Sequence, residues 1–301
     1  MSTIGIIGGT GFSERAKDYE TVATDYGPVK VGTLEIGGKK VYFVARHREL
    51  EAPHLVNYRA NVQALKKKGV ALVYSVSAAG RLHERVWPGH LGAVDDVDWD
   101  DLTREMTFAE KGLLLHTSMD TPFSPELRRR LHDAFDLVQE EIGRLYSNSQ
   151  DLRVGFHDDG TYFNIQGPSF STPAREARLR RTIENPRFIG QTLVPEVQLL
   201  QEMGIARAAL IMAVDHSCYP GAPPVKHADG VMHAVVKTAE AASYVLDEAI
   251  RNTPEDLYEP TAHTALIHSL HSRQVDLDLL RSNGRKELAE IIENELRTRN
   301  T

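Results

Sequence analysis

Short apolar runs alternate with amphipathic segments along most of the 301-residue chain. Five segments are predicted to be strands: TIGIIGG, KVYFVAR, ALVYSVSA, HLGAVDDV and AALIMAVD. Several are near-continuous apolar runs, as expected of strands buried on both faces of a largely parallel sheet. Between them, helical spacing of apolar residues, in several cases followed by a glycine that stops a helix, predicts four helices: VNYRANVQALKKKG, PELRRRLHDAFDLVQEEIGRL, TPAREARLRRTI and PEVQLLQEMG. This alternation predicts an α/β fold, a single domain with a central mixed, largely parallel β-sheet flanked by helices.

Two stretches, residues 97–125 and 215–230, show little periodicity and are predicted to be long loops, which in a compact domain often serve function. After about residue 255 the sequence changes to a charged amphipathic helix pattern that includes LDLLRSNGRKELAEIIENELRTRNT. We therefore expect a domain at residues 1–255 and a C-terminal helical extension at residues 256–301, packed on the domain or on a neighbouring subunit.

Composition narrows the class of protein. With 41% apolar and 26% charged residues, the chain is typical of soluble proteins, and its net charge of -7 argues against nucleic acid or an anionic membrane as the main partner. One cysteine, Cys218, excludes an internal disulfide and a cysteine-based zinc cluster, and the thirteen histidines show no metal-ligand spacing, so no metal is predicted. The absence of a membrane-length apolar run and of a signal peptide predicts a cytoplasmic protein.

The first predicted strand leads into a glycine-rich loop, Gly8-Gly9-Thr10-Gly11. Its backbone N–H groups and the Thr10 hydroxyl suit a single phosphate or sulfate, although a tight turn without a ligand explains the loop equally well. A dinucleotide-binding loop would need a further glycine where this chain has Glu14, which disfavours an NAD-binding epimerase.

Charged residues end two other predicted strands. Arg46 and His47 follow KVYFVA, and Asp215 ends AALIMAVD. Ligands of α/β proteins bind at the carboxyl ends of the strands, so an arginine and a histidine there can hold a dianion and an aspartate can act as an acid. The alternatives are surface side chains and a loop cap. No G-x-S-x-G motif supports a serine hydrolase.

Six segments together resemble the trimeric purine nucleoside phosphorylase and methylthioadenosine phosphorylase family: IGIIGGTGF, VNYRANVQALKKKGV, SAAGRL with PGHL, HTSMDTPFSP, GTYFNIQGPSFST and QTLVPE. Their order and spacing match from about residue 3 to residue 240. The resemblance implies a pentosyltransferase of purine salvage that cleaves a methylthioadenosine-like, 5′-modified purine nucleoside with inorganic phosphate as co-substrate and no cofactor. It also implies a homotrimer, or a dimer of trimers, with shared active sites.

The resemblance also implies roles for individual residues. Positions that hold phosphate match Thr10, Arg46, His47, Ser77 and Thr192. Positions around the nucleoside match Ala78, Phe170, Gln191, Ser217, Val231 and His116, of which His116 covers the 5′ end of the nucleoside in the adjacent subunit. Asp215 matches the acid that hydrogen-bonds N7 of the leaving purine, a role that requires a pKa raised by burial.

The chain departs from the family pattern at both ends of the expected site. The segment RHRELEAPH is two residues shorter than usual and adds Glu49 and Glu51 on the phosphate side, which leaves a non-catalytic nucleoside binder as an alternative. At the base, Ser217 replaces the second aspartate of D-x-D and Gln191 replaces a methionine, so a phosphorylase for a pyrimidine or 6-oxopurine nucleoside is a second alternative. Ala228, beside His227, leaves room for a larger or more polar 5′ group.

Overall fold

The computed structural model describes residues 2–9, 11–12, 15–16, 18–47, 51–100, 102–222, 228–270 and 274–299, with residues 228–230 and 299 described by their backbone alone. Thr10, Glu14, Glu49 and His227 lie outside the described residues, as does the side chain of Ala228. The predictions made for these five residues therefore stay predictions.

Eleven strands form one sheet. The strands are β1 (Thr3–Gly8), β2 (Asp18–Val22), β3 (Val29–Ile36), β4 (Lys39–Ala45), β5 (Val70–Arg81), β6 (Leu91–Ala93), β7 (Asp96–Trp99), β8 (Phe156–His157), β9 (Thr161–Asn164), β10 (Pro186–Gly190) and β11 (Ala206–Asp215). The helices are α1 (Tyr58–Lys67), α2 (Pro125–Tyr146), α3 (Pro173–Thr182), α4 (Glu196–Glu202), α5 (Ala228–Arg251), α6 (Pro260–Ser269), α7 (Leu277–Ser282) and α8 (Lys286–Arg299).

The strands follow the order β2-β3-β4-β1-β5-β10-β9-β7, while β11 pairs with β5 and β6, and β6 also pairs with β8. Parallel pairs join β1 to β4 and β5, β5 to β11, β9 to β10 and β7, and β6 to β8. Antiparallel pairs join β2 to β3, β3 to β4, β5 to β10 and β6 to β11. The predicted mixed, largely parallel sheet is confirmed.

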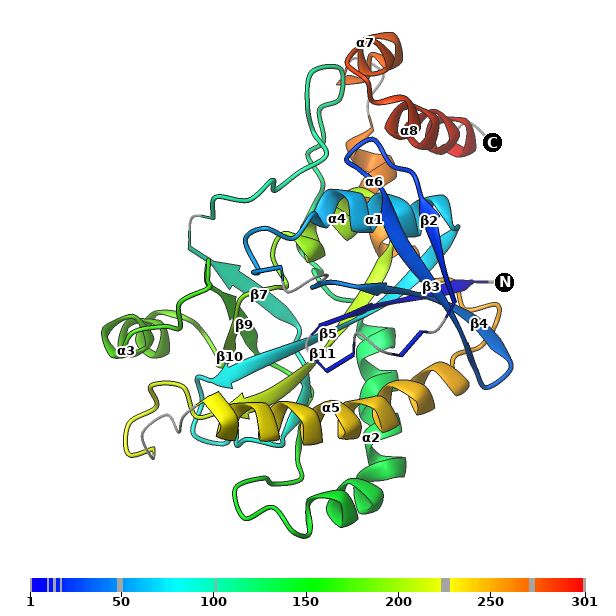
Figure 1. Ribbon diagram of the computed structural model, residues 1–301. Helices are drawn as coiled ribbons and strands as arrows, with labels where there is room; N and C mark the ends of the chain where they lie inside the picture. Colours follow the sequence, from blue (N-terminus) through cyan, green and yellow to red (C-terminus); the bar gives the residue numbers. More distant parts are fainter. Residues whose placement is uncertain are drawn as a thin grey trace.

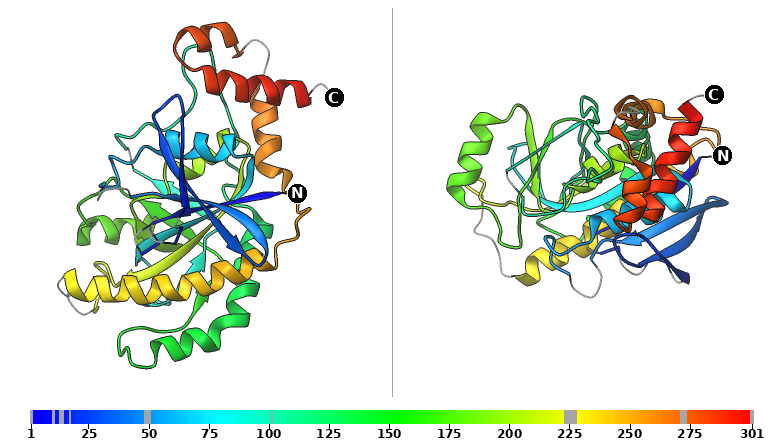
Figure 2. Two further views of the ribbon diagram at one scale, coloured as in Figure 1. Left: turned by 45° about the vertical axis from the view of Figure 1, so that its right-hand side comes forward. Right: turned by 90° about the horizontal axis from the view of Figure 1, so that it is seen from above.

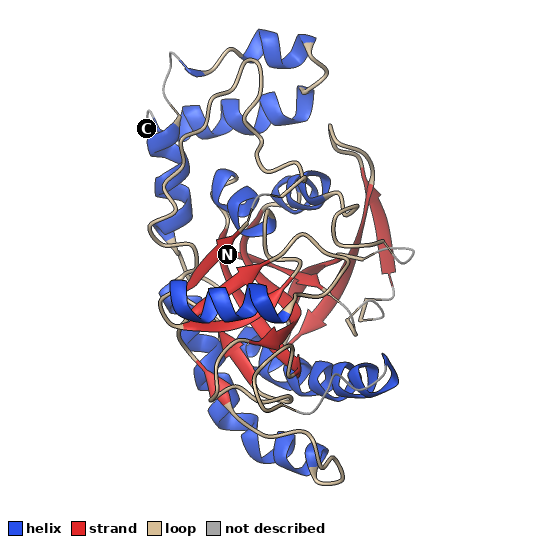
Figure 3. Cartoon of the chain, turned by 90° about the vertical axis from the view of Figure 1, so that its left-hand side faces the viewer, coloured by secondary structure: helices blue, strands red, loops and turns tan. Residues whose placement is uncertain are grey.

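Helices cover both faces of the sheet, and the alternation of side chains along β5 shows how (Figures 1 and 3). Leu72, Tyr74 and Val76 belong to the core shared with α2 and α5, whereas Val73 belongs to the core shared with α1, α4, α6 and α8. Because side chains of a strand alternate between faces, Ser75 must face the same side as Val73. Polar side chains late in β5 can therefore meet residues of α4.

Local sequence signals set where the helices begin. Asn57 accepts a hydrogen bond from Ala60 N at the start of α1, and Ser124 accepts one from Leu127 N at the start of α2. Thr172 caps α3 in the same way, and both α2 and α3 have proline in the first turn, where it costs no backbone hydrogen bond.

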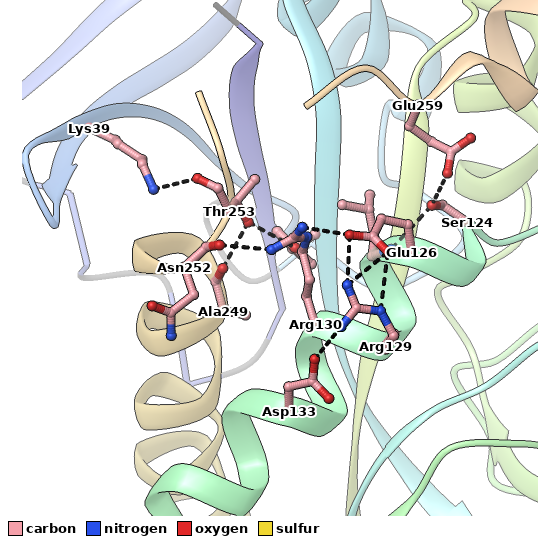
Figure 4. Close-up of polar contacts among 12 residues, drawn as sticks. Lys39, Ser124, Glu126, Arg129, Arg130, Asp133, Ala249, Asn252, Thr253 and Glu259 are labelled. Atoms are coloured by element: carbon pink, nitrogen blue, oxygen red, sulfur yellow. Dashed lines mark hydrogen bonds and ion pairs between the residues drawn. The ribbon is translucent and has the colours of Figure 1, made fainter. Parts of the chain in front are cut away.

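The end of α5 is tied to β4 and α2 by polar contacts (Figure 4). Lys39 Nζ donates to the carbonyl oxygens of Ile250 and Thr253 at 2.8 and 2.6 Å, which places a cation at the C-terminus of the helix. Arg130 of α2 donates to Asn252 O at 2.7 Å and to Glu126 at 2.5 Å. These contacts hold the long helices α2 and α5 against the sheet.

The elements differ from the prediction in several places. HLGAVDDV contributes to two short strands, β6 and β7. Residues 228–230, predicted as the end of a loop, begin the long helix α5, which was not predicted. The strands β2, β3, β8, β9 and β10 and the helix α6 were not predicted, because they are short or lack a long apolar run. The C-terminal helix pattern is broken into α7 and α8 at Gly284, whose φ of +81° favours glycine.

The C-terminal helices contact the rest of the chain at one end of the molecule (Figure 2). Leu280, Leu288 and Ile292 share a buried core with residues of α1 and α4. Lys66 of α1 also forms an ion pair of 2.7 Å with Glu295 of α8. Within the described part of the chain, no helix has both the length and the apolar character needed to cross a bilayer.

Candidate active site

Residues 75–80 of β5 bring three polar clusters together. Ser75 and Ser77 belong to the first two clusters, and Gly80 pairs with Asp215 of β11 at the third. A strand rises about 3.3 Å per residue, so Ser77 and Gly80 stand roughly 10 Å apart along β5. The carboxyl ends of β5 and β11 lie on the side of the sheet near α3 (Figure 1).

Arg46 forms the centre of the first cluster. Its guanidinium is 1% exposed and makes a two-pronged ion pair with Glu196, with Nε to Oε2 at 2.8 Å and Nη2 to Oε1 at 2.9 Å. Nη1 donates to Val76 O at 2.8 Å, and Ser75 Oγ donates to Glu196 Oε1 at 2.6 Å. Glu196 is the first residue of α4, where a carboxylate also meets the positive end of the helix dipole.

This pairing limits how Arg46 can hold an anion. A guanidinium has five N–H groups, and three are used by Glu196 and Val76. Nη1 also lies under the glycine loop, because a Cβ added to Gly9 would stand 2.8 Å from it. Phosphate binding by Arg46 stays a prediction, and it would use the second hydrogens of Nη1 and Nη2 while Glu196 balances part of the charge.

His47 is half-buried beside Arg46. Burial lowers the pKa of its imidazole, and the positive charge of Arg46 lowers it further. Nδ1 lies 2.9 Å from Glu51 O, and since a carbonyl only accepts, Nδ1 carries the proton. In the neutral ring Nε2 is then an acceptor, which suits the hydroxyl of a protonated phosphate.

The second cluster consists of three buried hydroxyl groups. Ser77 Oγ lies 2.8 Å from Thr192 Oγ1 and 3.3 Å from the hydroxyl of Tyr162. The exposed fractions of Ser77 and Thr192 are 1% and 8%. The sequence placed Ser77 and Thr192 in the same site, and the structure brings them into contact.

Asp215 ends β11 at the third cluster. Burial raises the pKa of its carboxyl, Ser217 N–H lowers it by donating to Oδ1, and the charge of Glu176 raises it. The resulting rise favours the protonated acid, as a proton donor at neutral pH requires. A Cβ on Gly80 would stand 2.7 Å from Asp215 Oδ1, so the strand approaches the carboxyl closely only because this residue is glycine.

Ser217 lies in the tight turn that follows Asp215. Its φ of +50° is unusual for a residue with a side chain, and hydrogen bonds on both sides hold it there. Ser217 N donates to Asp215, and Ser217 Oγ donates to Glu176 Oε1, while Cys218 N donates to Glu176 Oε2 at 3.0 Å. Glu176 comes from α3 and is fully buried.

Ala78 and Val231 lie on the other face of the sheet from Thr192. Both are partly buried and pack against the core between the sheet, α2 and α5. They are therefore apolar neighbours of the carboxyl end of β5, and Ala78 meets the second cluster through its carbonyl oxygen, 3.4 Å from Ser77 Oγ.

Gln191 and Phe170 occupy the loop side of the site. Gln191 Nε2 donates to the carbonyl oxygens of Pro168 and Ser169 at 3.4 Å, so the amide contacts backbone. A Cβ on Gly167, whose φ is +69°, would stand 2.1 Å from Gln191 Oε1. Phe170 is 73% exposed.

His116 is exposed on the loop between β7 and α2. The adjacent Leu115 and Leu113 are buried, and Leu113 forms an isolated bridge with Val275 before α7. The loop is thus anchored on its own chain while His116 is exposed, and its role in a neighbouring subunit stays a prediction.

Sequence reasoning missed four polar residues of the site. All four are buried: Glu196, Tyr162 and Glu176 contact the predicted residues Arg46, Ser77 and Ser217, and Ser75 donates to Glu196. A signal existed for Glu196, which stands inside QTLVPE at the start of a predicted helix. Glu176 gave none, because a glutamate among the arginines of TPAREARLRRTI is typical of a solvated helix face.

Among the described residues, no group of three histidine, cysteine, aspartate or glutamate side chains comes together as metal ligands would. The polar side chains of the three clusters are hydroxyl groups, carboxylates and an arginine. Such a set suits an anion at the Arg46 end and a hydrogen-bonding organic group at the Asp215 end.

A family model described as the phosphorylase superfamily matches residues 3–251, which contain all three clusters. The chain belongs to the phosphorylase superfamily. Among the relatives of this superfamily protein is an S-methyl-5′-thioadenosine phosphorylase from Thermofilum pendens, 37% identical over 266 residues, covering 84% of this chain and 93% of the relative. Another of the same name, from Pyrococcus furiosus, is 36% identical over 264 residues and covers 85% and 95%.

Solved structures agree with the sequence relatives. A methylthioadenosine phosphorylase from an antarctic soil metagenomic library has a TM-score of 0.80 and 29% identity, covering 96% of this chain and 98% of that one. A variant of an adenosine/methylthioadenosine phosphorylase from Schistosoma mansoni, in complex with methylthioadenosine, has a TM-score of 0.79 and 26% identity, covering 91% and 100%. The resemblance to nucleoside phosphorylases and the predicted fold of this superfamily protein are thereby confirmed.

Proposed function

We propose that this protein catalyses phosphorolysis of a methylthioadenosine-like, 5′-modified purine nucleoside. The products are the free purine and a ribose 1-phosphate derivative, which makes the enzyme a pentosyltransferase that uses inorganic phosphate and no cofactor. The observation that carries the proposal is Asp215, a half-buried residue at the carboxyl end of β11 whose carboxyl pKa is raised. The hydroxyl pair of Ser77 and Thr192 lies toward the same end of the sheet. The names of the relatives support the same chemistry.

The reaction places two demands on the site. As the bond between C1′ and the base nitrogen breaks, its electron pair moves onto the purine, and a proton from Asp215 to N7 neutralises the developing charge. An oxygen of phosphate meanwhile forms the new bond to C1′ from the opposite face of the sugar. The hydroxyl pair of Ser77 and Thr192 and the remaining N–H groups of Arg46 would hold that phosphate.

The 5′ end of the nucleoside would be covered from another subunit. The exposure of His116, on a loop anchored by the buried Leu113 and Leu115, supports this arrangement because the side chain is accessible to a partner. We infer a cytoplasmic homotrimer, or a dimer of trimers, in which each active site is completed by its neighbour and serves purine salvage.

Base release from a nucleoside panel, with and without inorganic phosphate, tests the proposal. The panel contains methylthioadenosine, adenosine, inosine, uridine and a 5′-amino analogue. Release that needs phosphate and is fastest for a 5′-modified purine nucleoside supports the proposal. Fastest release from uridine would contradict the purine assignment, and nucleoside binding without any release would identify a non-catalytic binder.

A further inference from the structure

Glu176 is a buried carboxylate that contacts the turn beside the proposed acid. It is 0% exposed, and three donors surround it: Ser217 Oγ at Oε1, and Cys218 N at 3.0 Å and Arg180 Nη1 at 3.3 Å at Oε2. A carboxylate oxygen is an acceptor, and each of these three partners is a hydrogen-bond donor. Glu176 therefore accepts all three hydrogen bonds.

This arrangement fixes the polarity of Ser217. A serine hydroxyl has a single proton, and here that proton is donated to Glu176. Toward any other neighbour, Oγ can only accept. A serine hydroxyl without such a partner can either donate to a ligand or accept from it. The hydrogen bond to Glu176 is therefore what makes Ser217 an acceptor.

Ser217 and Asp215 stand side by side at one spot. A Cβ on Gly80 would lie 2.7 Å from Asp215 Oδ1, 2.9 Å from Ser217 Cβ and 3.2 Å from Ser217 Oγ, so both side chains border the same point of β5. A ligand that reaches the acid of Asp215 therefore also reaches the hydroxyl of Ser217.

We propose that Glu176 is a positioning residue that selects a 6-aminopurine by holding Ser217 as an acceptor beside Asp215. The proposal rests on the proposed function. On the outer edge of adenine, N7 is an acceptor and the 6-amino group is a donor, whereas a 6-oxopurine presents acceptors at both places. Protonated Asp215 donates to N7 of either base, but Ser217 Oγ can pair only with the amino group.

A 6-oxo group would place two lone pairs against each other, at O6 and at Ser217 Oγ. To donate to O6 instead, Ser217 would have to turn its proton away from Glu176. The buried carboxylate would then lose a hydrogen bond that water cannot replace. The mismatch should lower kcat/KM roughly 10- to 100-fold for the 6-oxo nucleoside.

Glu176→Gln tests the proposal because it should reverse the polarity of Ser217. Cys218 N–H and Arg180 both need an acceptor, so the amide oxygen would take the place of Oε2 and the amide NH₂ would face Ser217. Ser217 Oγ would then accept from the amide and turn its own proton toward the base. The loss of the Glu176 charge near Asp215 would change the rate for both nucleosides. The ratio of the two rates therefore isolates the effect of Ser217.

The assay compares kcat/KM for 5′-methylthioadenosine and 5′-methylthioinosine at saturating phosphate, so that only the base differs. Wild type should favour the adenine nucleoside, and Glu176→Gln should lower that preference at least about tenfold. Asp100→Asn is the matched control, because Asp100 pairs with Arg175 and Arg178 of α3 without touching Ser217. It should keep the wild-type ratio.

A folded Glu176→Gln variant with the wild-type ratio would overturn the proposal, and so would a wild-type ratio near one. If Glu176→Gln does not fold, Ser217→Ala replaces it: removal of the acceptor should bring the ratio toward one, and an unchanged ratio would refute the proposal. Calorimetric binding of adenine and hypoxanthine separates this test from the proposed function. Adenine bound more tightly by wild type supports the proposal even without phosphate-dependent cleavage, and equal binding overturns it.

Discussion

The ion pair of Arg46 and Glu196 offers a test of where the anion site lies. In Glu196→Gln the side chain keeps its size but loses its charge. Its amide can accept from only one of the two guanidinium nitrogens that Glu196 now serves at 2.8 and 2.9 Å, and its NH₂ would face the other. Arg46 would remain 1% exposed with an uncompensated charge.

The magnitude follows from burial. Removing one partner of a buried ion pair costs about 3–5 kcal/mol, and we take about 3 kcal/mol because the amide keeps one acceptor. For domains slightly smaller than this chain, 1 kcal/mol moves the unfolding midpoint by about 2–4 °C. Without phosphate, the midpoint of Glu196→Gln should therefore fall by at least about 6 °C.

Phosphate should restore part of this loss. If the remaining N–H groups of Arg46 face the bound anion, phosphate supplies the charge that Glu196 no longer provides, and a ligand that binds the folded state raises its stability. Thermal unfolding of wild type and variant is measured across a phosphate titration. The midpoint of Glu196→Gln should rise more than that of wild type.

Two results would refute this reasoning. A midpoint equal to wild type without phosphate would mean that the pair does not stabilise the fold, and equal phosphate-induced shifts would mean that Arg46 does not face the anion. Glu293→Gln is the control, because Glu293 accepts from Arg281 and Arg297 at 2.6 and 2.8 Å on the surface of α8. Exposed pairs contribute about 0.2–1 kcal/mol, so its midpoint should change far less and should not depend on phosphate.

Three further predictions concern single residues. Asp215→Asn should lower kcat for methylthioadenosine about 10²- to 10⁴-fold without unfolding the protein. Burial raises the pKa of the Asp215 carboxyl, and since the protonated form donates, wild-type kcat should fall as pH rises through that pKa. Steady-state rates across pH check both expectations, and an unchanged variant rate would remove Asp215 from the acid role. His47→Ala should raise KM for phosphate about tenfold with little change in KM for the nucleoside; equal changes in both would argue against a phosphate contact. Arg207→Met should leave the unfolding midpoint at or above that of wild type. Burial lowers the pKa of Arg207 to about 9, and its Nε and Nη2 have no partner among the described residues. A clear fall of the midpoint in calorimetry would contradict this.

The parts of the fold that the sequence predicts are those with a long, regular apolar signal. The strands β1, β4, β5 and β11 are buried runs, and the helices α1 to α4 carry caps or glycine stops. The strands β8 and β9 have two and four residues, too few for a period to appear. Helix α5 was missed although its apolar positions are plentiful, because its first turn follows a proline-rich segment that favours a loop.

The candidate site could be predicted only on the side that the ligand would touch. Motif matching named Ser77, Thr192 and Asp215, and the structure places these at the carboxyl end of β5. It could not name Glu176, which lies 41 positions before Ser217 in the chain. A glutamate in a charged helix becomes a buried acceptor only when that helix packs on the turn after β11, and such packing leaves no mark in local periodicity.

Each polar group of the site has an internal partner that limits what it can offer a ligand. Arg46 donates from Nε and Nη2 to Glu196 and has two further N–H groups for a ligand. His47 donates from Nδ1 to Glu51 O, so its Nε2 is an acceptor. Ser217 gives its only proton to Glu176 and keeps lone pairs. The side chains in a motif name the residues near a substrate, but the neighbours behind them decide which act as donors and which as acceptors. On the proposal above, the replacement of an aspartate by Ser217 does not relax the choice of base. Glu176 packs behind Ser217 and accepts the hydrogen bond of its hydroxyl, which leaves Oγ as an acceptor toward the base.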